Sequence, residues 1–136
     1  MWFIFALLSA ITAALASIFA KVGLENVNSN LATAIRTIVI LFMTWGIVYV
    51  SGAYKQIPLI SERNWWFIIF SGLATGVSWL CYFKALQLGQ TSNVVAIDKF
   101  SLVLTIILAF FILHEAISIK MIIGCILITL GTLMMI

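Results

Sequence analysis

Charged and turn residues divide this sequence into five apolar segments, each close to the ~20 residues that a helix needs to cross a bilayer. By number the segments are 2–20, 31–50, 65–86, 94–113 and 119–136. The segments are continuously apolar and do not alternate with polar residues, which argues against transmembrane strands. We therefore predict an all-α integral membrane protein with five transmembrane helices that form one domain over residues 1–136.

Composition supports a membrane location and excludes several classes of function. The chain is 65% hydrophobic and only 8% charged, so it lacks the polar residues that a soluble domain needs for its surface. No basic cluster suits nucleic acid. Cys81 and Cys125 lie inside apolar runs without metal-ligand or disulfide spacing. The first segment follows no Lys or Arg and is long enough to span, so we predict a retained helix and not a cleaved signal.

The loops carry almost no charge bias that would set the orientation of the chain. With five spans, Lys55, Arg63 and Lys120 fall on the side of the N-terminus, and Lys21 and Lys84 on the other. A chain without a preferred orientation can insert both ways, and two opposite copies can pair. We therefore predict an antiparallel homodimer; the alternative is a fixed orientation set by weak cues.

Small residues and caps indicate how the helices pack and where they begin. Gly72 and Gly76 have GxxxG spacing, and Gly124 and Gly131 lie seven apart on one face. Both patterns are typical of close contacts between membrane helices. Two serines, Ser61 and Ser118, stand where helix N-caps are expected.

Two segments carry polar stripes. Ser71, Thr75, Ser78 and Tyr82 share one face of the third segment, and Trp79 lies on the stripe beside it. In the fourth segment, Asp98, Ser101 and Thr105 share a face. Two such stripes favour a shared polar cavity, because polar groups in lipid are costly unless they face protein or water. Alternatively, the hydroxyls donate to carbonyls one turn back in their own helices.

Three ionisable residues lie more than a turn inside the predicted spans, namely Arg36, Asp98 and Lys99. We expect them to form one cluster, which serves either as a salt-bridged gate or as a site for substrate or coupling ion. Asp98 is the first candidate for a proton carrier if protons drive transport. No arrangement typical of catalysis or of metal binding is present, so we expect neither enzymatic activity nor a metal or cofactor.

The order of several segments resembles a known family. These segments are "YFKALQLG" at the end of the third span, "TSNVVAIDKFS" at the start of the fourth, the turn "FFILHEAIS" and the last span "IIGCILITLGTLMMI". The first two spans, "SAITAALASIFAKVGLENVNSNLATAIRT", also fit. The chain resembles the EamA domain of the drug/metabolite transporter superfamily over essentially its whole length.

This resemblance implies a transport function and a partner. Most family members have ten helices in two inverted five-helix repeats, so the chain is similar to one repeat that needs a second copy. The family implies secondary transport of small metabolites by alternating access through a cavity between repeats. Arg36, Asp98 and Lys99 fall where related transporters line that cavity. One departure is His114-Glu115, where the turn usually reads Gly-Glu. Another is the absence of the mid-membrane glutamate of the small multidrug exporters.

From these observations we predict a transporter, most simply an exporter, of a small metabolite in the inner membrane. The basic excess of the predicted cluster favours a substrate with an anionic group. Two alternatives stay open: a component that flips lipid-linked carriers, or a membrane subunit that assembles without transporting. The sequence leaves the substrate, the direction and the coupling ion open.

Overall fold

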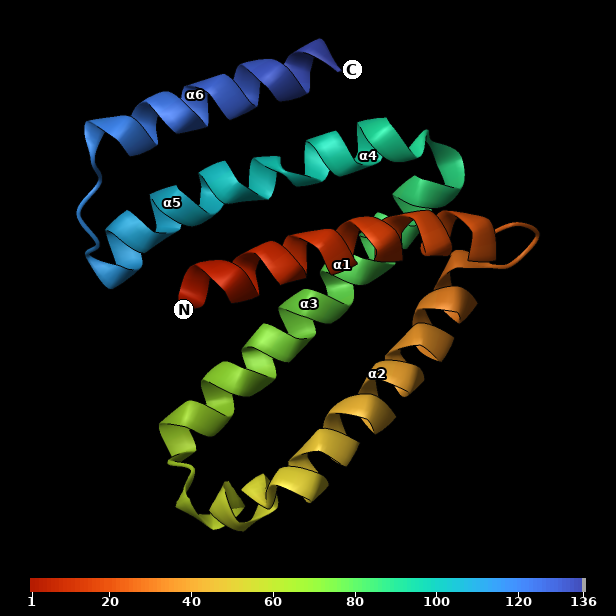
Figure 1. The fold of residues 1–136 in the computed structure, drawn as a ribbon, viewed down its shortest axis with the longest axis vertical. Helices are drawn as coiled ribbons and strands as arrows, with labels where there is room; N and C mark the ends of the chain where they lie inside the picture. Colours follow the sequence, from red (N-terminus) through yellow and green to blue (C-terminus); the bar gives the residue numbers. More distant parts are fainter. Residues whose placement is uncertain (136) are drawn as a thin grey trace. The chain divides into compact units, whose positions relative to one another are not determined.

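The computed structural model describes residues 1–135, and every regular element in this range is helical (Figure 1). In chain order the elements are α1 (Trp2–Gly23), α2 (Ser29–Ser51), the short 3₁₀-helix η1 (Ala53–Leu59), α3 (Glu62–Leu88), α4 (Thr91–Asp98), α5 (Phe100–Leu113) and α6 (Ile119–Met134). This confirms the predicted all-α class.

Four stretches of this chain are long and apolar enough to cross a membrane: α1, α2, α3, and Thr91–Leu113, which comprises α4 and α5. Helix α6 is apolar but has only 16 residues. The fifth predicted segment reached residue 136, which lies outside the described residues. A count of five spans therefore stays a prediction.

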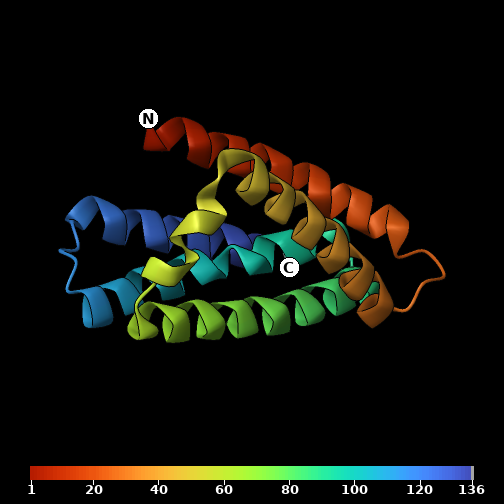
Figure 2. The ribbon, with the colours of Figure 1, turned by 90° about the horizontal axis from the view of Figure 1, so that it is seen from below.

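The chain divides into two compact units, Ala20–Gln87 and Met1–Phe19 with Leu88–Ile136, and each is described by itself. In the first unit, α2 and α3 run in opposite directions and are joined through η1 (Figures 1 and 2). The buried residues of this unit lie just after α1, at the start of α2 and near the end of α3: Leu24, Ser29, Thr33, Phe83 and Leu86.

Helix α2 begins at Ser29 because the preceding residue caps it. The Asn28 side chain accepts hydrogen bonds from the backbone N–H groups of Asn30 and Leu31, at 2.9 and 3.4 Å. Such a cap satisfies two of the four N–H groups that a helix start leaves without an internal partner. Helix α2 ends at Ser51 and is followed by Gly52, whose φ of 71° is a left-handed conformation that glycine adopts at little cost.

In the second unit, α5 and α6 lie side by side and antiparallel (Figure 1). The turn between them begins at His114, which has a left-handed φ of 55°. Ser118 caps α6, since its hydroxyl accepts the N–H of Met121 at 3.2 Å. Ser61 does the same for Asn64 at the start of α3, at 3.3 Å. Both predicted caps are confirmed.

Apolar side chains are exposed along nearly all of the described helices. Among the described residues the only buried apolar side chains are Leu24, Phe83, Leu86 and Ala96. The most apolar windows of the four long stretches are 0 to 6% buried. A surface of this kind suits lipid or another copy, and not water.

Candidate functional site

A cavity of about 400 Å³ opens in the second unit beside Asp98. Residues from α4, α5 and α6 line it, and they are Ile97, Asp98, Phe100, Ser101, Leu104, Thr129, Thr132 and Leu133. Four of these side chains carry oxygen, namely Asp98, Ser101, Thr129 and Thr132. The cavity therefore combines apolar walls with a few oxygen groups, as small-molecule and ion sites commonly do.

A one-residue break between α4 and α5 places Asp98 at this cavity. Helix α4 ends at Asp98 and α5 begins at Phe100, while the N–H of Lys99 is shared between the carbonyls of Val95 and Ala96, each at 3.2 Å. The next bond, from Leu102 N–H to the Lys99 carbonyl at 3.1 Å, spans three residues and is of the 3₁₀ type. A tight turn inside a long apolar stretch often marks a functional position.

Helix α6 contacts this break through a side chain. The Thr132 hydroxyl donates to the Ala96 carbonyl at 3.3 Å, and Ala96 is buried. This bond joins α6 to α4 one turn before the break. The Thr129 hydroxyl, one turn earlier in α6, donates to the Cys125 carbonyl at 2.8 Å.

The carboxylate of Asp98 has a single cation beside it within its unit. The Nζ of Lys99 lies 3.9 Å from Oδ2 of Asp98, and the two side chains are 61% and 44% exposed. A pair this long and this open adds little to stability. The Asp98 carboxylate therefore remains accessible from the cavity side.

Arg36 lies in the other unit, against aromatic rings. Its guanidinium carbon is 4.7 Å from the centre of the Trp79 ring and 5.2 Å from that of Phe83. These rings are four residues apart on one face of α3, and Phe83 is buried. Contacts of this kind stabilise a cation that is partly removed from water.

The helix ends around Arg36 are held together by two long-range hydrogen bonds. Nζ of Lys21 donates to the Leu86 carbonyl, and Nε2 of Gln87 donates to the Val27 carbonyl at 2.7 Å. Leu86, whose carbonyl accepts the first of these bonds, is fully buried. The end of α3 is thereby fixed to the segment that leads into α2, on which Arg36 lies.

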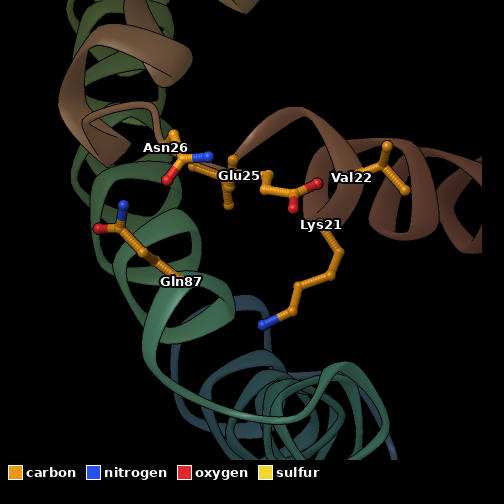
Figure 3. A pocket seen from close by; sticks show the side chains of 6 residues that line it. Lys21, Val22, Glu25, Asn26 and Gln87 are labelled. Carbon is orange, nitrogen blue, oxygen red and sulfur yellow. The ribbon is translucent and has the colours of Figure 1, made fainter.

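A second pocket, of about 630 Å³, lies at these same helix ends (Figure 3). Its lining comprises Lys21, Val22, Leu24, Glu25, Asn26 and Gln87. Figure 3 shows the Lys21 side chain extending away from the Glu25 carboxylate, in keeping with its bond to the Leu86 carbonyl.

Comparison with known proteins identifies the family of this helical chain. The model of the EamA-like transporter family matches residues 1–136. The chain belongs to this family. It is 43% identical over 134 residues to a Sinorhizobium sp. protein named "Uncharacterized transporter in cobO 3'region". The aligned part comprises 98% of this chain and 95% of that protein. No solved structure was found to match.

Membership of the EamA-like family confirms the main functional prediction. The protein is a multi-pass membrane transporter and not an enzyme. The resemblance drawn from the sequence is thus correct at the level of the family.

The structure brings together part of the predicted pathway. Asp98 and Ser101 share the cavity of about 400 Å³, and Lys99 forms the break beside it. Arg36 and Trp79 are in contact in the other unit. Whether Arg36 joins Asp98 and Lys99 in one cluster stays a prediction, since the two groups belong to different units.

The hydroxyl stripes follow the alternative named above at two positions. Thr75 donates to the Ser71 carbonyl at 2.9 Å, and Thr105 donates to the Ser101 carbonyl at 2.8 Å. Both hydroxyl groups therefore donate inside their own helices, while their oxygen lone pairs can still accept hydrogen bonds. On the third-segment stripe, Ser78 is exposed and Tyr82 contacts the Phe83 ring edge-on. A role for these residues in a pathway stays a prediction.

The glycines predicted to pack helices face open space in this structure. A Cβ atom added at Gly72, Gly76, Gly124 or Gly131 would meet no atom within 4 Å. These glycines do not hold a close helix contact within their own unit. A packing role for them stays a prediction.

Of the four oxygen-bearing side chains of the cavity, those of Thr129 and Thr132 are not among the predicted site residues. These threonines lie three residues apart in the last segment and so share a face. Their spacing was a usable signal.

Proposed function

We propose that this protein is a secondary transporter that exports a small metabolite by alternating access, as an antiparallel homodimer in the inner membrane. Each copy supplies one domain of five membrane-spanning helices, residues 1–136, and two copies in opposite orientation complete the fold. The family supports transport. The weak charge bias of the loops and the exposed apolar helices support a second copy.

The observation that carries this proposal is the accessible carboxylate at a helix break. Asp98 lines a cavity of about 400 Å³ with Ser101, Thr129 and Thr132, in an apolar stretch long enough to span. Ionisable groups at such depth are kept chiefly for transport or proton transfer. We assign Asp98 to the coupling ion or to the gate of the pathway, with Lys99 as its neutralising partner.

Transport by purified protein in liposomes tests this function. We expect Asp98→Asn to abolish solute flux driven by a pH gradient, because the variant cannot exchange a proton. The matched control is Glu115→Gln, which removes a carboxylate from the turn between α5 and α6 and should transport normally. Equal, pH-dependent flux in Asp98→Asn and wild type would exclude Asp98. Purified protein that moves no solute alone would favour the subunit role.

Labelling from one side of the membrane tests the dual orientation. A cysteine at Gln56, exposed in η1, is introduced into protein in which Cys81 and Cys125 are replaced by serine. A maleimide that does not cross the membrane should label about half of the copies in intact cells if both orientations occur. Labelling of all copies in intact cells would contradict the antiparallel arrangement. So would labelling that appears only after the cells are lysed.

A further inference from the structure

Arg36 is a permanent cation inside a long apolar helix, and within its own unit it meets aromatic rings and no carboxylate. The unit Ala20–Gln87 contains two carboxylates, Glu25 and Glu62, and neither forms an ion pair with Arg36. Among residues 20–87, Arg36 also makes no hydrogen bond through its side chain. Its guanidinium donors are therefore left for a partner outside this unit.

The aromatic contacts leave the hydrogen-bonding edge of the guanidinium open. Trp79 and Phe83 lie 4.7 and 5.2 Å from its central carbon, as ring contacts with a planar cation do. Such contacts use the face of a guanidinium, whereas its five N–H groups point outward in its plane. The rings thus fix the position of Arg36 and leave its fork available.

The depth of Arg36 makes an anionic partner favourable. Arg36 lies seven residues after Ser29, where α2 begins, which corresponds to ~10 Å along the helix. A cation at this depth is costly unless it is paired. A carboxylate or phosphate matches the guanidinium fork because two parallel N–H···O bonds form at once.

The site is also held in place before any ligand arrives. Phe83 is only 3% exposed and Leu86 is fully buried, so the end of α3 cannot shift freely. Gln87 and Lys21 tie that end to the chain on either side of the loop that precedes α2. Groups fixed in advance lose less entropy on binding.

We propose that Arg36, held against Trp79 and Phe83, binds an oxyanion group, carboxylate or phosphate, of the transported solute. This inference rests on the proposed function and names its substrate class. It differs from the role given to Asp98, which concerns the coupling ion or the gate.

Binding of small oxyanions to purified protein in a non-ionic detergent tests the inference. Acetate, inorganic phosphate and neutral acetamide are each titrated at constant sodium chloride, and tryptophan fluorescence is followed. We expect a saturable change with acetate or phosphate and none with acetamide. Trp79→Phe keeps an aromatic ring and should remove the signal, which assigns it to Trp79.

Two substitutions of Arg36 separate its charge from its shape. Arg36→Gln should weaken oxyanion binding by about tenfold or more, as expected for losing hydrogen bonds to a charged group. Arg36→Lys should fall between this variant and wild type, because lysine keeps the charge without the fork. The matched control is Arg63→Gln, since Arg63 lies 5.7 Å from the Phe67 ring near the start of α3. It should bind like wild type.

Results of three kinds would overturn the inference. The first is unchanged affinity in Arg36→Gln, or an equal loss in Arg63→Gln. The second is an Arg36-dependent signal that arises with phosphatidylglycerol micelles but not with acetate or phosphate, which would make the ligand a lipid headgroup. The third is oxyanion binding that occurs only in Asp98→Asn, which would make Asp98 the normal partner of Arg36.

Flux and binding together distinguish this inference from the proposed function. Flux of neutral solutes without Arg36-dependent oxyanion binding would refute the inference and leave transport intact. Arg36-dependent binding without flux of any solute would refute transport and leave the oxyanion site intact.

Discussion

Replacing Gln87 by alanine should loosen the junction between the end of α3 and the start of α2. The main interaction lost is the 2.7 Å bond from Nε2 of Gln87 to the Val27 carbonyl, which joins residues 60 apart in sequence. The longer, exposed bond of 3.4 Å that Nζ of Lys84 donates to Oε1 of Gln87 is lost with it. A hydrogen bond between neutral groups contributes ~0.5–1.5 kcal/mol net, and those between membrane helices average ~0.6 kcal/mol. Val27 is half-buried, so its carbonyl would regain water only in part. We expect a loss of about 1 kcal/mol in the free energy of unfolding, roughly fivefold in the equilibrium constant.

Unfolding in mixed micelles with increasing dodecyl sulfate, followed by tryptophan fluorescence, measures this loss. The matched control is Gln90→Ala, because Gln90 precedes α4 without a side-chain capping bond. The control should stay within ~0.5 kcal/mol of wild type, as surface substitutions usually do. If Gln87→Ala and Gln90→Ala unfold at the same dodecyl sulfate fraction, the bond to Val27 does not stabilise the junction.

Substitutions at two further positions test helix ends. Asn28→Ala removes the cap of α2 and should lower the free energy of unfolding by ~1 kcal/mol in the same assay. Asn28→Asp should retain the cap, because aspartate also accepts hydrogen bonds from the N–H groups at the helix start. Equal stability of wild type and both variants would contradict the capping role. His114 has a left-handed φ of 55°, which glycine adopts without strain, so His114→Gly should raise the midpoint of thermal unfolding slightly and the free energy of unfolding by up to ~1 kcal/mol. His114→Val should lower the midpoint. A lower midpoint for the glycine variant would show that the imidazole itself stabilises the turn.

The helices and their ends could largely be read from the sequence, because apolar length and capping residues act locally. Ser61 and Ser118 were expected caps and prove to be so. The start of α2 was placed two residues late, since Asn28 lies within a run of polar residues and its capping role was not identified. The segment around Pro58, between the second and third predicted spans, forms η1, a 3₁₀-helix that the apolar pattern does not indicate.

The break at Lys99 could not be predicted from the usual signals. No glycine or proline lies there, and the segment stays apolar on both sides of Asp98-Lys99. The break lies beside a contact from α6, the bond from Thr132 to the Ala96 carbonyl, which joins residues 36 apart. Such contacts are tertiary and leave little trace in local sequence.

The partners of Arg36 show the same limit. Charge alone pointed to Asp98, whereas within its unit Arg36 lies against Trp79 and Phe83. The two aromatic residues are four apart, which predicts that they share one face of the third segment. No local signal indicates that this face meets α2, because the register of two membrane helices is set by their packing.

The bond between Gln87 and Val27 also orders events during synthesis. Its two residues are 60 apart, and the bond of Lys21 to Leu86 spans 65 residues. At ~5–20 residues per second, a ribosome needs ~3–12 s to make 60 residues. For that interval the start of α2 relies on Asn28, whose capping bonds are local and form with the helix itself. A nascent chain therefore has its α2 cap several seconds before it can close the junction.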